Sequence, residues 1–136
     1  MMRPESEREE RRVSRSSDPL VALSRLLEAI RRSGPLETLA IADETGCLVA
    51  GAGRSADCEE LAALAPFLDA AWPANDTTPT RLEVLARSTE VRRLSVDGIS
   101  VLVCGQGGEP ARATGMPRAA AGCERILRES RRRPPT

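Results

Sequence analysis

Two residue types on which many enzymes rely are absent from this sequence. None of its 136 residues is histidine, and all twenty of its basic residues are arginine, so it contains no lysine. Histidine is the most common general base, and lysine forms Schiff bases and completes the Walker phosphate loop. Histidine-based triads and histidine-containing zinc sites are therefore excluded. We expect a protein that is not an enzyme and has no catalytic residues, metal or cofactor.

Aromatic residues and net charge are also scarce. Phe67 and Trp72 are the only aromatic residues, which leaves little surface on which nucleic-acid bases could stack. Twenty acidic residues balance the twenty arginines, so no net charge attracts nucleic acid or an anionic membrane over long range. We expect no nucleic-acid partner.

The four cysteines, at positions 47, 58, 104 and 123, form no C-x-x-C pair. We interpret them as small buried hydrophobic residues in a reducing compartment. The sequence begins without an apolar signal segment, and no later apolar run approaches the roughly 18 residues of a membrane span. These features predict a cytoplasmic protein without stable membrane insertion.

Charged and small polar residues dominate both ends of the chain. Residues 1–17 are predicted to be a disordered charged tail and residues 131–136 a basic disordered tail, with a single domain over residues 18–130. The domain opens with Asp18 as a helix N-cap and Pro19 in the first turn, and Gly34 ends that helix. Its apolar stripe is Leu20, Leu23, Leu27 and Ile30.

Turn signals divide the rest of the domain. The segment 43–46 joins strands at 36–42 and 47–50, and Asp97-Gly98 joins strands at 90–96 and 99–105. A further strand is predicted at 81–87 after a loop at 72–80. A capping-box-like helix runs from Asp57 to about residue 71, bent or restarted at Pro66. A glycine-rich loop at 106–115 precedes a final helix that starts at Met116.

These elements predict an α/β (α+β) fold of one small domain. Their order is α-β-β-α-β-β-β-α, which indicates a central five-stranded antiparallel sheet with flanking helices. Because residues 99–105 are nearly all apolar, we expect them to form a central strand covered on both faces.

Two glycine-rich segments suggest phosphate binding only weakly. Residues 51–56 match G-x-G-x-x-A, but a hairpin precedes them and Ala56 falls before the expected helix start at Asp57. Residues 105–108 could cradle an anion through backbone amides, but no helix is expected directly after them. We interpret both as connections, although the small residues at 51–53 also suggest either a strand end or a close neighbour.

The elements together resemble the roadblock family, the dynein light-chain relatives that in bacteria include regulators of a small Ras-like polarity GTPase. The resemblance spans about residues 19–129. It rests on "GPLETLAIADETGCLVAGAG", "ELAALAPFLDAA", "VRRLSVDGISVLVCGQGG" and "AAAGCERIL". It implies a sheet between helices, a homodimer formed through the second helix and the third strand, and a GTPase docking surface built by both subunits.

The resemblance also implies positions for these surfaces. Dimer contacts would fall on Leu61, Leu64, Leu68, Leu82 and Val84. Docking of the partner would involve the remaining face of residues 58–71, with Glu59, Glu60, Ala63 and Phe67 as partner-binding residues. Arg54 is a further candidate because its place near the start of this helix could bring it to an acidic region of the partner, although an exposed arginine is usually only solvated. Pro66 and the loop "WPANDTTPTR" depart from the expected helix surface, so docking specificity is expected to differ from that of known regulators.

The function implied is that of a homodimeric regulator or scaffold in bacterial signalling that binds a small Ras-like GTPase. Such relatives act as GTPase-activating proteins by repositioning groups of the GTPase itself, so the lack of catalytic residues is no objection. Two alternatives stay open: a dimeric adaptor in a signalling or polarity complex without a GTPase, and a small-molecule sensor or minor enzyme that uses a cysteine.

Overall fold

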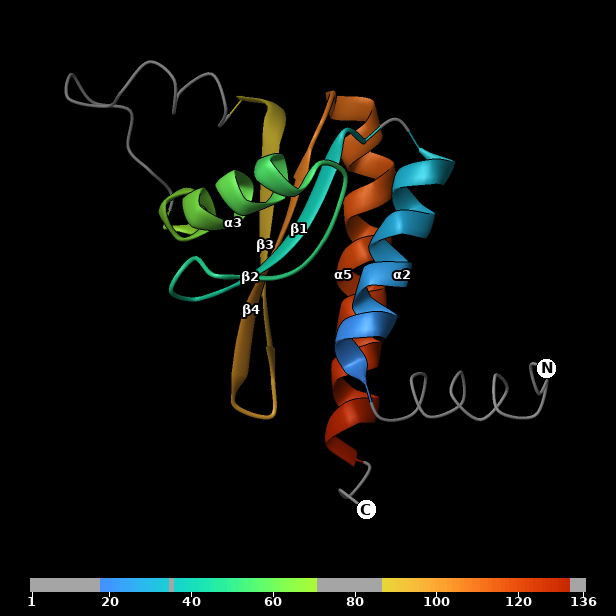
Figure 1. The fold of residues 1–136 in the computed structure, drawn as a ribbon, viewed down its shortest axis with the longest axis vertical. Helices are drawn as coiled ribbons and strands as arrows, with labels where there is room; N and C mark the ends of the chain where they lie inside the picture. The colour runs from blue at the N-terminus through green and yellow to red at the C-terminus, as the bar shows by residue number, and fades with distance from the viewer. Residues whose placement is uncertain (1–17, 35, 71–86, 133–136) are drawn as a thin grey trace, which may run out of the picture.

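The computed structural model describes residues 18–34, 36–70 and 87–132 (Figure 1). The predicted N-terminal tail, the last four residues, and residues 71–86, with Trp72, Leu82 and Val84, lie outside the described residues. The elements are α2 (Pro19–Ser33), β1 (Thr38–Asp43), β2 (Leu48–Ala52), α3 (Ser55–Asp69), β3 (Thr89–Val96), β4 (Ile99–Gln106) and α5 (Glu109–Arg132).

One antiparallel sheet organises these elements. Its strand order is β2-β1-β4-β3, so β1 and β4 are central and β2 and β3 form the edges. In Figure 1, α3 covers one face of the sheet, and α2 and α5 lie side by side on the other. The described part of the chain thus confirms an antiparallel sheet between helices, with four strands rather than five. The strand predicted at 81–87 falls almost entirely outside the described residues, and Arg87 lies in a helical turn.

The central position of β4 follows from its sequence. Alternate side chains of a strand point to opposite faces, and both faces of β4 are buried. Val101 and Val103 belong to the larger core cluster between the sheet and α2 and α5. Leu102 and Cys104 belong to the smaller cluster beneath α3. The prediction of a central strand covered on both faces is therefore confirmed.

Both predicted hairpin turns are also present. Asp97 and Gly98 both have positive φ values, 49° and 84°, as a two-residue type I′ turn requires. In the other turn Gly46 has φ 91°. The carboxylate of Asp43 accepts hydrogen bonds from the backbone N–H of Thr45 and of Cys47 and from the Thr45 hydroxyl. These bonds, the Thr45 hydroxyl foremost, lower the pKa of Asp43 because they stabilise its charged form.

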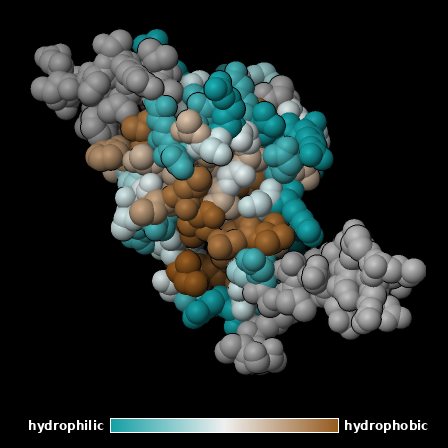
Figure 2. Space-filling view, viewed as in Figure 1, coloured by the Kyte–Doolittle hydropathy of each residue, from teal (hydrophilic) through white to brown (hydrophobic). Residues whose placement is uncertain are grey.

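The helix α2 begins as predicted. Oδ1 of Asp18 accepts a hydrogen bond from the backbone N–H of Leu20 at 3.0 Å, and Pro19 occupies the first turn. Three members of the predicted stripe, Leu23, Leu27 and Ile30, are buried, but Leu20 is 51% exposed. Figure 2 shows hydrophobic side chains reaching the surface over β2 and the adjacent part of α2.

The predicted boundaries of the other two helices were wrong. The helix α3 begins at Ser55, two residues before Asp57, which lies in its first turn and is not its cap. The helix α5 begins at Glu109 instead of Met116 and continues to Arg132, so residues 131 and 132 are helical and not part of a tail. Pro66 lies inside α3 without ending it. None of the described helices is long and apolar enough to cross a membrane.

Gly115 misled the prediction of where α5 begins because it serves packing, as Gly122 does further along the helix. A Cβ atom at Gly115 would collide with the Leu36 side chain, and one at Gly122 would lie 2.7 Å from Cδ1 of Leu26. These glycines let α5 approach α2 and the segment that leads into β1. They do not mark a loop.

Candidate functional site

The helix α3 presents three faces with different surroundings. Four of its residues face the sheet and are buried: Cys58, Leu61, Ala62 and Ala65. Leu61, one of the predicted dimer contacts, is only 4% exposed and belongs to the core cluster beneath α3. Most of its side chain is therefore already covered within one copy of the chain.

The outward face of α3 carries three of the predicted partner-binding residues. Glu59, Ala63 and Phe67 follow one another at intervals of four residues, so they form one exposed stripe along the helix. We call Glu59, Ala63 and Phe67 the α3 crest. Phe67 is 52% exposed, although it is the only phenylalanine of the chain. Arg54, also exposed, immediately precedes the helix. An exposed aromatic side chain is of a type that is enriched at protein-docking surfaces.

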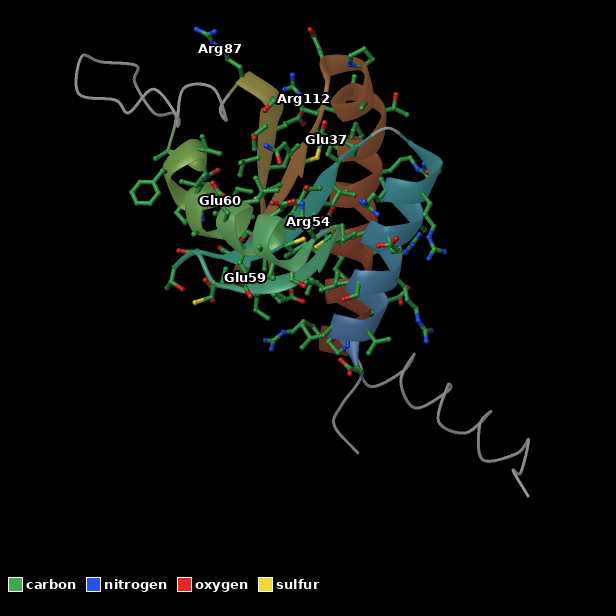
Figure 3. All side chains as sticks on the ribbon, turned by 45° about the horizontal axis from the view of Figure 1, so that its top comes forward. Glu37, Arg54, Glu59, Glu60, Arg87 and Arg112 are labelled. Atoms are coloured by element: carbon green, nitrogen blue, oxygen red, sulfur yellow. The ribbon has the colours of Figure 1, made fainter. Side chains whose placement is uncertain are left out.

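The third face of α3 borders a groove next to the edge of the sheet. The groove has a volume of about 220 Å³. Its lining comes from α3, β3 and β4, namely Asp57, Glu60, Leu61, Leu64, Leu68, Thr89 and Gln106. In Figure 3, Glu59 and Glu60 lie on different sides of α3, so the five predicted partner-binding residues do not share one face. The half-buried Leu64 and Leu68 lie together in the groove, while Leu82 and Val84 are outside the described residues.

Sequence reasoning missed Thr89 and Gln106 as neighbours of α3. They lie at the start of β3 and the end of β4, which pair with each other, and no local pattern connects them to the helix. The hydroxyl of Thr89 is buried and has no hydrogen-bond partner within the described part of the chain. Only the fold brings this polar atom to the groove.

Ion pairs hold the C-terminal end of α3, whereas the carboxylates near its N-terminal end are not neutralised by ion pairs within the described residues. Arg93 on β3 binds Asp69 at 2.8 Å and Glu44 in the β1–β2 turn at 3.6 Å. Within the described residues, no ion pair involves Asp57 or Glu59. The side chain of Arg54 makes no capping hydrogen bond to the helix, and a positive charge at a helix N-terminus is unfavourable. The Arg54 side chain is therefore exposed beside the helix start and is not engaged in capping α3.

The cysteines mostly behave as the sequence predicts. Cys58, Cys104 and Cys123 are buried, but Cys47 is exposed. Burial raises the pKa of the Cys104 and Cys123 thiols to about 12, and it raises that of Cys58 as well. These three thiols stay protonated near neutral pH and are poor nucleophiles. The described residues also contain no group of histidine, cysteine and acidic side chains suited to a metal ion.

Neither glycine-rich segment has the geometry of a phosphate site. The strand β2 pairs antiparallel with β1, so residues 51–56 do not follow a strand of a parallel βαβ unit, and Ala56 lies inside α3. Contrary to expectation, α5 does start directly after Gly108. Nevertheless, the N–H of Gly107 donates to the carbonyl of Ser88 at 2.9 Å, and Nε of Arg112 donates to the carbonyl of Gly107. The N–H and the carbonyl of Gly107 are thus both used in hydrogen bonds within the chain.

Comparison with solved structures, unlike the comparisons of sequence, gives a match. No protein-family model matches the chain, and no curated protein matches its sequence. Among solved structures, the chain is similar to Myxococcus xanthus MglB, with a TM-score of 0.53 and 13% sequence identity. The match covers 82% of this chain and 91% of that chain. At this identity the likeness concerns the fold, and it confirms the roadblock-type fold that the sequence resemblance implied.

Proposed function

We propose that this chain is a non-enzymatic, homodimeric, cytoplasmic regulator that binds a small Ras-like GTPase and stimulates its GTP hydrolysis. The roadblock-type fold shared with MglB supports a GTPase regulator of this type. The observation that carries the proposal is the exposed α3 crest with Phe67 at 52% exposure, on the helix to which the family resemblance assigns docking.

The mechanism needs no catalytic group from this chain. A docking surface that contacts one conformation of the GTPase better than another shifts the GTPase towards that conformation. The crest offers an aromatic anchor and a carboxylate, and Arg54 adds a positive charge beside them. If docking alone acts, Arg54→Ala weakens binding but leaves the hydrolysis rate at saturation unchanged. An arginine that stabilises the transition-state charge directly would instead lower the saturated rate by orders of magnitude.

The proposed homodimer uses the groove side of α3. Leu64 and Leu68 are half-buried there, and a partner subunit would cover them. Leu64→Arg would bury an unpaired charge in that contact and should split the dimer. Light scattering coupled to size-exclusion chromatography measures this directly. A Leu64→Arg monomer that still bound its GTPase would overturn the idea that docking needs both subunits.

The test of function uses candidate Ras-like GTPases from the same genome, each loaded with GDP or with a GTP analogue. We expect a complex on size-exclusion chromatography only with the GTP analogue, and faster single-turnover hydrolysis when the chain is added. Phe67→Ala should weaken the complex at least tenfold. Leu20→Ala is the matched control, because Leu20 is 51% exposed but lies on α2, across the sheet. Equal binding of the GDP and GTP forms would contradict regulation and favour an adaptor.

A further inference from the structure

The two layers that flank the sheet carry opposite charge. The helix α3 contains four carboxylates and no arginine. The helices α2 and α5 together contain nine arginines against four glutamates. Figure 1 places these layers on opposite faces of the sheet. The zero net charge of the chain therefore conceals an acidic side and a basic side.

On the acidic side, the α3 crest projects an apolar group among carboxylates. Phe67 is 52% exposed. Glu59 lies two turns before it on the same stripe, and Asp57 is exposed in the first turn of the helix. Within the described residues neither carboxylate has an ion-pair partner. This surface suits a counterpart that offers arginine side chains around a shallow apolar floor.

The outer face of α5 offers such a counterpart. A shallow depression of about 440 Å³ is lined there by Ala121, Glu124, Arg125, Arg128 and Glu129. The Arg128 guanidinium binds Glu124 at 2.7 Å, so the charges of these two side chains offset each other. Arg125 is exposed and takes part in no ion pair among the described residues, and Ala121 leaves apolar floor between the longer side chains. Arginine side chains stack on aromatic rings and attract them through the ring quadrupole.

We propose that the chain associates with further copies of itself from head to tail. The α3 crest of one copy docks on the outer face of α5 of the next, with Phe67 in the depression and Glu59 facing Arg125. Because the two surfaces differ and lie on opposite sides of the molecule, the contact does not close into a symmetric pair and adds copies in a row. The inference stands independently of the GTPase, although it uses the same crest and would compete with GTPase docking.

Ionic strength separates this contact from the apolar dimer proposed above. Surface charge pairs are screened over about 10 Å at 0.1 M salt and about 3 Å at 1 M. In sedimentation velocity at about 0.02 M salt, we expect the weight-average sedimentation coefficient of the full chain to rise continuously with protein concentration. At about 0.5 M salt the rise should disappear. A single species at every concentration in low salt overturns the proposal.

Charge reversal identifies the two surfaces. Glu59→Arg makes the crest more basic, and Arg125→Glu makes the α5 face more acidic. Each variant alone should therefore lose the rise of the sedimentation coefficient with protein concentration. An equimolar mixture of the two should regain it, because the reversed crest of one then meets the reversed α5 face of the other. Glu37→Arg is the matched control for Glu59→Arg, since Glu37 is exposed before β1, away from both surfaces, and its reversal changes the net charge by the same amount and sign. Association that survives either reversal, or a mixture that stays dissociated, would sink the proposed contact.

Phe67→Ala tests the apolar part of the contact separately. Phe67 is half-exposed, so its removal should leave thermal unfolding nearly unchanged. It should reduce the rise of the sedimentation coefficient with protein concentration at low salt. A rise equal to that of the unaltered chain would show that Phe67 does not enter the depression on α5, and would overturn that part of the proposed contact.

Discussion

At the scale of single residues, Gly51 shows how the absence of a side chain lets two elements meet. A Cβ atom at this position of β2 would lie 2.8 Å from Sγ and 3.0 Å from Cβ of Cys58 on α3. Cys58 itself is buried, with its thiol directed to the carbonyls of Leu39 and Ala52. Of the two readings that the sequence left open for residues 51–53, a close neighbour is thus the correct one at Gly51.

This contact predicts the effect of one methyl group. Gly51→Ala should lower the free energy of unfolding by about 1–3 kcal/mol, the usual cost of overpacking. Urea denaturation measures the change. In the double variant Gly51→Ala/Cys58→Ala the sulfur is absent. The double variant should therefore lose less stability than the sum of the losses of the two single variants. Strict additivity would show that the collision is relieved by other movements.

The exposure of Cys47 predicts selective chemistry. A thiol reagent applied to the native protein near pH 8 should label Cys47 alone, because the other three thiols are buried and their pKa values are raised. Mass spectrometry counts the labels, and denaturant should expose all four thiols. Rapid native labelling of Cys58, Cys104 or Cys123 would revive the alternative of a cysteine-based activity.

At the scale of elements, the features that depend on local sequence pattern could be predicted. Both turns have residues that favour positive φ, and the apolar run of β4 permitted only a central position. The start of α5 could not be found in the same way. Gly115 resembles a loop signal, and its contact with Leu36 exists only once the tertiary structure has formed.

The candidate site was predictable only in part for a similar reason. The family resemblance assigned Leu61, Leu64 and Leu68 to one shared dimer contact. In the structure the sheet-facing stripe instead includes Cys58, Ala62 and Ala65 beside Leu61. Small residues are well suited to contact a sheet closely, but they contribute little to a hydrophobic pattern. Leu64 and Leu68 are therefore turned towards the groove.

Pro66 gives a prediction for α3 as an element. Proline has no N–H, so the carbonyl of Ala62 lacks its helical hydrogen bond, and the ring crowds the preceding turn. Pro66→Ala should restore that bond and raise the free energy of unfolding by about 1–3 kcal/mol. Urea denaturation again provides the measurement. A loss of stability would indicate that the half-buried ring contributes more through packing than it costs the helix.

At the scale of the whole molecule, the amino-acid composition makes alkaline titration unusually simple. The chain contains no lysine and no tyrosine, and arginine keeps its charge throughout. The side chains that titrate between about pH 9 and pH 12 are therefore the cysteines. Two of these have pKa values of about 12 in the folded protein, against 9.0 for an unperturbed thiol.

Stability should consequently fall as the pH rises above about 9. The unfolded chain releases its thiol protons near pH 9, whereas folded Cys104 and Cys123 retain theirs to about pH 12. The unfolded state thus binds fewer protons in this window, and each thiol lowers the free energy of unfolding by about 1.4 kcal/mol per pH unit. Urea denaturation between about pH 7 and pH 11 tests this. The variant Cys104→Ala/Cys123→Ala should be less stable at pH 7 but lose most of the slope; an unchanged slope would contradict the assignment.

The basic layer formed by α2 and α5 has a further consequence because arginine alone supplies its positive charge. A lysine-rich surface can be neutralised by acetylation, and a histidine-rich surface by a modest rise in pH. Neither route exists for this layer. Its charge is permanent under cellular conditions, so whatever it attracts can be released only by competing ions, by a competing anionic partner, or by a change in that partner.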